Sequence, residues 1–121
     1  MELNEYQEKA MTTCLKSCDN VSYMAFNLVG EVGEFCSKIA KGIRKSQLKI
    51  DDNQLVCLVD DDAERDELET ALKMEAGDVL WQLSGLCKIM GWKLDDVAQE
   101  NLDKLASRKE RGVIDGNGDN R

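Results

Sequence analysis

The chain contains no proline in 121 residues. Proline breaks helix interiors, so its absence leaves the whole sequence free to form long helices. Alanine, leucine, lysine, glutamate, glutamine and methionine, all good helix formers, are plentiful, and runs of β-branched residues are absent. The length allows one domain with a single core. The sequence therefore predicts an all-α domain, a bundle of four to five helices.

Hydrophobic periodicity divides the chain into helices and connections. It predicts four helices, over about residues 2–18, 22–45, 63–90 and 94–111. Ser22 is the expected N-cap of the second helix, and Gly91 is expected to end the third. The polar, acidic stretch 46–62 is expected to be a connector. Residues 1–114 form the predicted domain, and the tail 115–121 is expected to be disordered.

Two acidic pairs lie far apart in the sequence, in the segments GEVGE and MEAGDVLW. The first pair is Glu31 and Glu34, and the second is Glu75 and Asp78. Residues three positions apart lie on one face of a helix, so each pair presents two neighbouring carboxylates. Two facing helices would gather all four, and these repel one another unless a cation lies among them. We therefore expect the four acids to bind Mg²⁺, which prefers oxygen ligands, with Mn²⁺ as a substitute.

A helical wheel of the second helix leaves two interpretations of its charged side open. The apolar side, which is the expected packing surface, carries Leu28, Val29, Val32, Cys36, Ile39 and Ile43. The opposite stripe carries Glu31, Glu34, Lys38, Lys41 and Lys45. Such a stripe is often a solvated face with pairs such as Glu34–Lys38. The glycines beside the acids, Gly30, Gly33 and Gly77, fit either tight helix packing or the close approach of a ligand.

The sequence contains no histidine, which excludes several catalytic arrangements. Ser-His and Cys-His nucleophile pairs and the Glu-x-x-His motif of di-iron bundles all require it. The net charge of −8 argues against binding to nucleic acid or to an anionic membrane. No stretch is apolar enough for a membrane span, and the N-terminus lacks the apolar core of a signal peptide. The five scattered cysteines fit buried thiols in a reducing compartment, so we expect a cytoplasmic protein.

Three segments together resemble the MazG-like family of all-α nucleoside triphosphate pyrophosphohydrolases. They are LVGEVGE at 28–34, EAGDVLW at 75–81 and NLDKLASR at 101–108, within a resemblance that covers roughly residues 3–114. The resemblance implies Mg²⁺-dependent hydrolysis of a (deoxy)nucleoside triphosphate between its α- and β-phosphates. The products would be a nucleoside monophosphate and pyrophosphate, in the service of nucleotide-pool control or house-cleaning.

The resemblance also implies roles for individual residues. The metal-binding acids of the family match Glu31, Glu34, Glu75 and Asp78. Its phosphate-approaching positions match Lys41, Asn101 and Lys104. The catalytic base that activates the attacking water is expected to be Glu31 or Glu34, and Arg108 lies at the basic end of the last motif.

The family further implies a homo-oligomer, and we expect a tetramer in preference to a dimer. Apolar residues lie on more than one side of the predicted helices, among them Met24, Phe35, Leu80 and Cys87, which agrees with a surface covered by a partner. Other functions stay open, because a phosphoribosyl-ATP pyrophosphohydrolase or a dUTPase-like relative would share the acidic motif. A non-catalytic helical module that oligomerises or binds a regulatory partner is the alternative from a different class.

Overall fold

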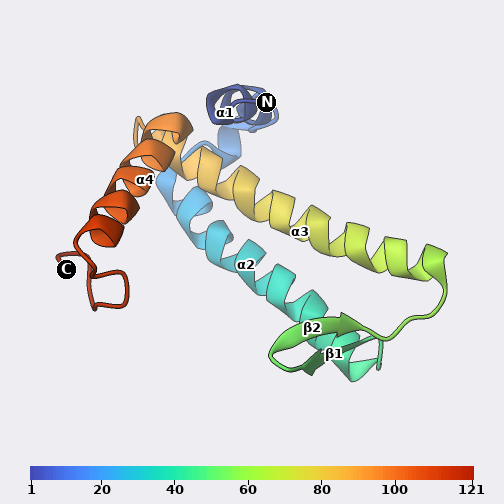
Figure 1. The fold of residues 1–121 in the computed structure, drawn as a ribbon. Helices are drawn as coiled ribbons and strands as arrows, with labels where there is room; N and C mark the ends of the chain where they lie inside the picture. Colours follow the sequence, from blue (N-terminus) through green and yellow to red (C-terminus); the bar gives the residue numbers. More distant parts are fainter.

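The computed structural model describes all residues from 1 to 121 (Figure 1). Most of the chain lies in four α-helices, α1 (Leu3–Met11), α2 (Val21–Arg44), α3 (Asp62–Ile89) and α4 (Leu94–Glu110). A short 3₁₀ turn precedes α2, and between α2 and α3 lie two strands, β1 (Leu48–Asp51) and β2 (Gln54–Cys57). The predicted helical fold is therefore confirmed, with the addition of a small sheet. No helix has the length and apolar character needed to cross a membrane.

The all-α prediction is wrong at the connector 46–62, because β1 and β2 form an antiparallel hairpin there. The register pairs Leu48 with Cys57, Lys49 with Val56, Ile50 with Leu55 and Asp51 with Gln54. The turn places Asp52 and Asn53 at φ of 50° and 58°, a left-handed conformation that these short polar side chains tolerate. Leu48 is buried against Gly42, where a Cβ would lie only 2.6 Å from Leu48 Cδ1. Turn chemistry and this one apolar contact explain the hairpin within an acidic segment.

The first helix is shorter than predicted, since the helix expected over 2–18 ends at Met11. The hydroxyls of Thr12 and Thr13 donate to backbone carbonyl oxygens three residues earlier, at 2.6 and 2.7 Å. Hydroxyls that bond to nearby carbonyls offer the backbone an alternative to continuing the helix. The 3₁₀ turn Lys16–Cys18 then replaces what would have been the last helical turn.

Side-chain caps begin the two long helices. The N-cap of α2 is Asn20, and not Ser22 as predicted, because Asn20 Oδ1 accepts a 2.8 Å hydrogen bond from the backbone N–H of Tyr23. Asp61 caps α3 in the same way, accepting at 2.9 Å from the backbone N–H three residues on. Gly91 follows Met90, the C-cap of α3, and has φ of +76°, as predicted for the residue that ends this helix.

α2 and α3 run antiparallel and side by side, and α1 lies across the end of this pair (Figure 1). The indole N–H of Trp81 on α3 donates to Ala10 O at 3.1 Å. Gln7 on α1 donates to Ser84 O at 3.2 Å and accepts from Leu94 N at 3.2 Å, so one side chain links α1, α3 and α4. From this junction α4 diverges from the α2–α3 pair (Figure 1).

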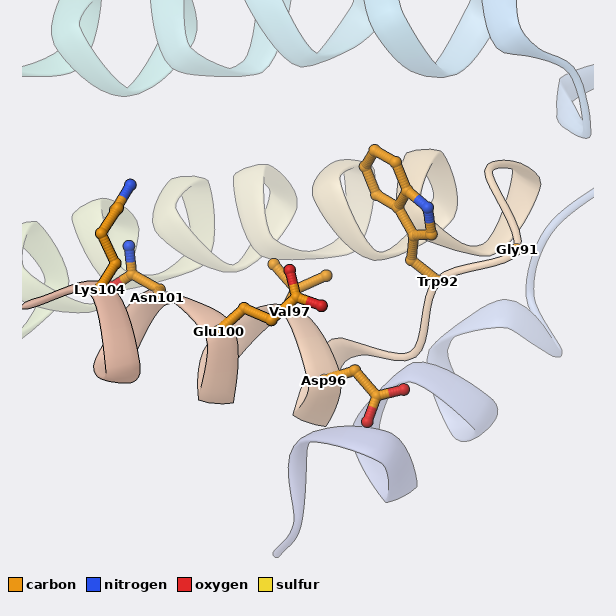
Figure 2. Close-up of a pocket in the computed structure, with 7 residues that line it drawn as sticks. All are labelled: Gly91, Trp92, Asp96, Val97, Glu100, Asn101 and Lys104. Carbon is orange, nitrogen blue, oxygen red and sulfur yellow. The ribbon is translucent and has the colours of Figure 1, made fainter. Parts of the chain in front are cut away.

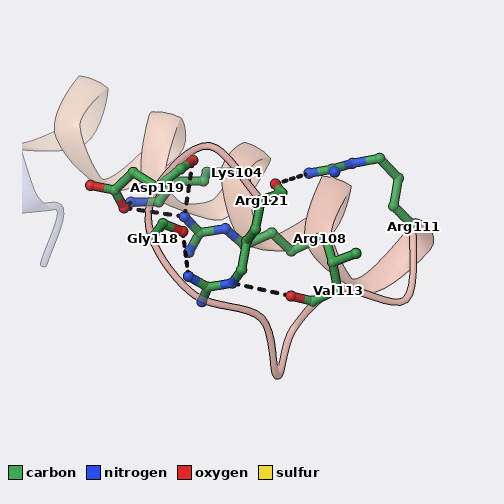
Figure 3. A network of polar contacts seen from close by, with 7 residues as sticks. All are labelled: Lys104, Arg108, Arg111, Val113, Gly118, Asp119 and Arg121. Atoms are coloured by element: carbon green, nitrogen blue, oxygen red, sulfur yellow. Dashed lines mark hydrogen bonds and ion pairs between the residues drawn. The ribbon is translucent and has the colours of Figure 1, made fainter.

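The residues after α4 fold back against that helix (Figure 3). Residues 115–121, predicted to be disordered, contain no helix or strand but make several hydrogen bonds in this structure. The division into a domain of 1–114 and a separate tail stays a prediction.

The core of the single chain is small, since only 11 of 121 residues are buried. Its most enclosed point lies between α2 and α3, where Met24 is fully buried. A Cβ on Gly85 would clash with Met24 Sδ, so this glycine lets the two helices approach closely. Gln82, also buried, donates to Met24 O at 3.4 Å. The packing between the long helices is therefore partly polar.

The side of α2 predicted to pack is exposed in the single chain. Val29 and Val32 belong to that apolar side, yet they are 73% and 44% exposed. α3 instead packs on the stripe that carries Glu31, together with Met24 and Asn27. The prediction from the helical wheel, that the apolar side of α2 is its packing surface, is therefore wrong for the contact between α2 and α3. The close contact at the Met24 position determines this orientation, and hydrophobicity alone does not reveal it.

Candidate metal centre between α2 and α3

Three carboxylates from two helices meet near the middle of the α2–α3 pair. Glu31 and Glu34 come from α2 and Glu75 comes from α3. Each offers one oxygen, and these three oxygens all lie within 4.8 Å of one another. The structure therefore brings together three of the four predicted metal ligands, although the hairpin separates them in sequence.

Glu75 is the most enclosed member of this acid cluster, with a side chain that is 13% exposed. Its Oε1 lies 3.1 Å from Nζ of Lys38 on α2. Its Oε2 is buried and has no hydrogen-bond partner. A buried carboxylate oxygen without a donor is unfavourable unless a donor or a cation reaches it. Oε2 is thus the clearest local sign that the cluster takes a further ligand.

Glu31 is held in place by hydrogen bonds that cross from α2 to α3. Asn27 Nδ2 donates to Glu31 Oε1 at 3.2 Å and to Gln82 Oε1 at 2.9 Å. Gln82 is itself anchored on Met24, one turn before Asn27. Because Asn27 bonds to only one oxygen of Glu31, the other oxygen stays available to a ligand or a water molecule.

The pKa of Glu31 is raised above its ordinary value of 4.5. Burial is the largest cause, followed by the negative charges of Glu34 and Asp78. The hydrogen bond from Asn27 opposes the rise. The carboxylates therefore repel one another when no cation is present, as the spacing of the acids in the sequence predicts.

Asp78, the fourth predicted ligand, lies outside the group of three oxygens. Its side chain is exposed on α3, one turn after Glu75. It lies near enough to raise the pKa of Glu31, and after burial it is the second cause that raises the pKa of Tyr6 on α1. Asp78 thus adds negative charge at the edge of the cluster next to α1.

The donor set fits a hard divalent cation such as Mg²⁺ or Mn²⁺. All three clustered donors are carboxylate oxygens, the ligands that such ions prefer. Lys38 supplies one positive charge against three negative ones, and Glu75 Oε2 remains without a partner. A divalent cation at this position would balance the remaining charge and give that oxygen a partner.

The predicted phosphate-binding residues do not join the acids within one chain. Lys41 is exposed on α2 and forms no ion pair. Asn101 and Lys104 lie on α4 and line a separate cavity of about 450 Å³ (Figure 2). That cavity is lined by Gly91, Trp92, Asp96, Val97, Glu100, Asn101 and Lys104, and by none of the four acids. In Figure 2 the side chains of Trp92, Asn101 and Lys104 point to the same side.

Two residues beside the acids make contacts that were not predicted. Lys38 is expected to pair with Glu34 along α2, but it bonds across to Glu75 on α3. Asn27 orients Glu31, and its position four residues earlier is a usable signal for such a contact. The Lys38 pairing depends on how two helices are placed relative to each other, so no local pattern could have shown it.

Replacing Glu31 by Gln is expected to stabilise the metal-free protein. The pKa of Glu31 is raised in the folded state, so its ionised form opposes folding. This destabilisation is fully present above the folded-state pKa and disappears as the pH falls through it. The melting temperature should rise by about 1–3 °C near neutral pH and by less near pH 5, which calorimetry in EDTA can measure. Gln retains the oxygen that accepts from Asn27, so a lower melting temperature would contradict the repulsion argument.

Comparison with known proteins shows the family to which the chain belongs. A sequence profile of the MazG nucleotide pyrophosphohydrolase domain matches residues 20–113, the segment from α2 to the end of α4. The Gene 37 protein of Mycobacterium phage L5 is 37% identical over 128 aligned positions that cover the whole of both chains. No solved structure matches the chain. Because the profile covers most of the sequence and includes all three clustered carboxylates, the chain belongs to the MazG nucleotide pyrophosphohydrolase family.

Proposed function

We propose that the protein hydrolyses a (deoxy)nucleoside triphosphate between its α- and β-phosphates, in a reaction that requires Mg²⁺ and yields a nucleoside monophosphate and pyrophosphate. The observation that supports this most is the acid cluster of Glu31, Glu34 and Glu75, with its unpartnered buried oxygen, in a member of this family. On its own the cluster would repel a triphosphate, so substrate binding requires a cation there. Mg²⁺, or Mn²⁺ in its place, would neutralise charge on the phosphate oxygens when bound.

The acids of the cluster have different surroundings, and we therefore assign them different roles in the reaction. In this proposal Glu34 and Glu75, which come from two helices, hold the cation. Asp78, at the edge of the cluster, completes the ligand set. Glu31 is fixed through one oxygen by Asn27, which leaves the second oxygen free to accept a proton from the attacking water. Glu31 is therefore the proposed base, and Glu34 is the alternative.

We also propose that the active protein is a homo-oligomer, a tetramer in preference to a dimer. The chain exposes 8889 Å², whereas a compact monomer of 13.6 kDa exposes about 6,600 Å². The excess is larger than the roughly 800 Å² that one partner buries in a standard interface, which favours more than one interface per chain. Because α4 diverges from the acid cluster, a second copy is the natural source of Asn101 and Lys104 for each site.

Analysis of the reaction products tests the proposed function. The full chain is incubated with Mg²⁺ and a panel of ribo- and deoxyribonucleoside triphosphates, including dUTP, with phosphoribosyl-ATP as a further substrate. We expect pyrophosphate and a monophosphate as the first products of at least one member of the panel, and no turnover in excess EDTA. Orthophosphate as the first product, or full turnover in EDTA, would show that the proposed chemistry is wrong. The preferred substrate also separates a general pyrophosphohydrolase from its dUTPase-like and phosphoribosyl-ATP relatives.

One contact favours a second candidate, a non-catalytic helical module that oligomerises or binds a regulatory partner. The 3.1 Å ion pair between Lys38 and Glu75 shows that part of the acid cluster has a structural partner already. This candidate predicts no pyrophosphate release from any nucleotide and no increase of the melting temperature with Mg²⁺. The enzymatic proposal predicts pyrophosphate release and a higher melting temperature with Mg²⁺, because a cation that binds only the folded state stabilises it.

A further inference from the structure

The residues that follow α4 form a loop that is closed by arginines (Figure 3). Arg121 donates from Nε to Val113 O at 3.1 Å and from Nη1 to Gly118 O at 2.6 Å. Arg111 Nη2 donates to Arg121 O at 2.7 Å. Gly118 has φ of +77°, a conformation that glycine adopts without strain. The loop therefore has a defined path, and this path carries the next residue, Asp119, onto α4.

The side chain of Asp119 lies against two basic residues of α4 (Figure 3). Its Oδ1 accepts a 3.1 Å hydrogen bond from Arg108 Nη2 and lies 3.7 Å from Lys104 Nζ. Arg108 Nη2 also donates to Asp119 O at 3.4 Å. The hydrogen bond from Arg108, and then the charge of Lys104, hold the pKa of the Asp119 carboxyl below its ordinary value. One carboxylate of the tail thus pairs with both cations.

The Arg108 guanidinium is only partly satisfied by this arrangement. Its side chain is 6% exposed, and its Nε is buried without a hydrogen-bond partner. A phosphate group offers two oxygens to the fork of an arginine and can accept from Nε and a terminal nitrogen together. Asp119 reaches Nη2 alone. A phosphate is therefore the better partner for Arg108 once the tail has moved aside.

We propose that the C-terminal tail, residues 115–121, competes with the substrate for a phosphate-binding site formed by Lys104 and Arg108. Asp119 occupies the position where a polyphosphate contacts Lys104 and Arg108, and binding of the polyphosphate displaces it. The inference rests on the proposed function for the identity of the polyphosphate, and it adds Arg108 as a phosphate ligand and the tail as a regulator of affinity. The side chain of Asp119 is 87% exposed, and exposed ion pairs are weak, so the contact opens readily.

Asp119→Asn tests the proposal, with Asp115→Asn as the matched control. Asp115 is an exposed acid of the same tail that makes no hydrogen bond or ion pair through its side chain. Binding of inorganic tripolyphosphate to the full chain is measured by calorimetry at low salt in EDTA, so that no metal at the acid cluster contributes. We expect Asp119→Asn to bind about two- to fivefold more tightly than the wild type, and the control to change by less than about 1.5-fold. Equal tightening in both variants, or no tightening in Asp119→Asn, would overturn the proposal.

Hydrolysis measured in parallel separates this proposal from the proposed function. With a nucleoside triphosphate and Mg²⁺, Asp119→Asn should lower KM by a similar factor. Tighter tripolyphosphate binding by this variant in a protein that hydrolyses no nucleotide would support the competing tail and refute the enzymatic function. Hydrolysis by a protein whose tripolyphosphate affinity is the same with and without the substitution would do the reverse.

Discussion

Replacing Glu34 by Gln is expected to lower kcat by about 100-fold or more while leaving the melting temperature of the metal-free protein unchanged or slightly higher. Glu34 is exposed and makes no hydrogen bond or ion pair, so the structure gives its side chain no part in holding the fold. Its carboxylate oxygen nevertheless lies within 4.8 Å of those of Glu31 and Glu75. A large loss of activity would therefore reflect the chemistry of the cluster and not a damaged helix.

Glu67→Gln is the matched control for this variant. Glu67 is an exposed acid of α3 without an ion pair, so the same charge is removed away from the cluster. The steady-state rate of pyrophosphate release and the melting temperature in EDTA are measured for both variants. If Glu34→Gln kept more than half of the wild-type kcat, Glu34 would be an ordinary solvated residue and the proposed site would be wrong.

Replacing Val29 by Glu is expected to dissociate the protein into monomers and to reduce its activity by at least about tenfold. Phe26, Val29 and Val32 follow one line on α2 and are 78%, 73% and 44% exposed, which places Val29 at the centre of an apolar strip. A carboxylate in the middle of a subunit contact would be buried without a partner. Separation of the copies would then remove the α4 residues that each acid cluster lacks within its own chain.

Thr70→Glu provides the comparison, because it adds the same charge at an exposed polar position of α3. Light scattering at micromolar concentration gives the mass of each variant, and the pyrophosphate assay gives its activity. A wild-type mass near 13.6 kDa with full activity would contradict both the oligomer and the need for a second copy. Equal dissociation of the two variants would point to general charge repulsion and not to the apolar strip.

The helices were predictable from the sequence where local chemistry determines them. The absence of proline and the long periodic segments predict α2, α3 and α4 well, and Gly91 ends α3 through its positive φ. The hairpin was not predictable from hydrophobicity, because it depends on a two-residue turn and on the burial of Leu48. The end of α1 was missed because two threonine hydroxyls satisfy backbone carbonyls there.

Three of the four predicted acids meet in the cluster and Asp78 lies at its edge, but the surroundings of the cluster were not predictable. Spacing three residues apart puts each pair on one helical face, and antiparallel packing then brings Glu31, Glu34 and Glu75 together. Which face of α2 meets α3 depends on the fit of Met24 against Gly85, a property of two helices at once. The ion pair of Lys38 follows from the same fit. The position of α4 depends on the junction with α1, so the sequence motif shared by Asn101 and Lys104 could not show that they lie away from the acids.

The hairpin connects α2 and α3 at the end of the helix pair away from the close contact of Met24 with Gly85. Thirteen positions separate Glu31 from Arg44, the last residue of α2, and thirteen separate Asp62, the first residue of α3, from Glu75. At about 1.5 Å per residue, both acids lie roughly 20 Å along their helices from the ends next to the hairpin. One residue inserted into either helix between its acid and the contact of Met24 with Gly85 would shift that acid by about 1.5 Å and turn it by about 100° relative to its partner. Changes in hairpin length leave both of these helical segments intact, so the hairpin is the part of the chain where length is free to vary.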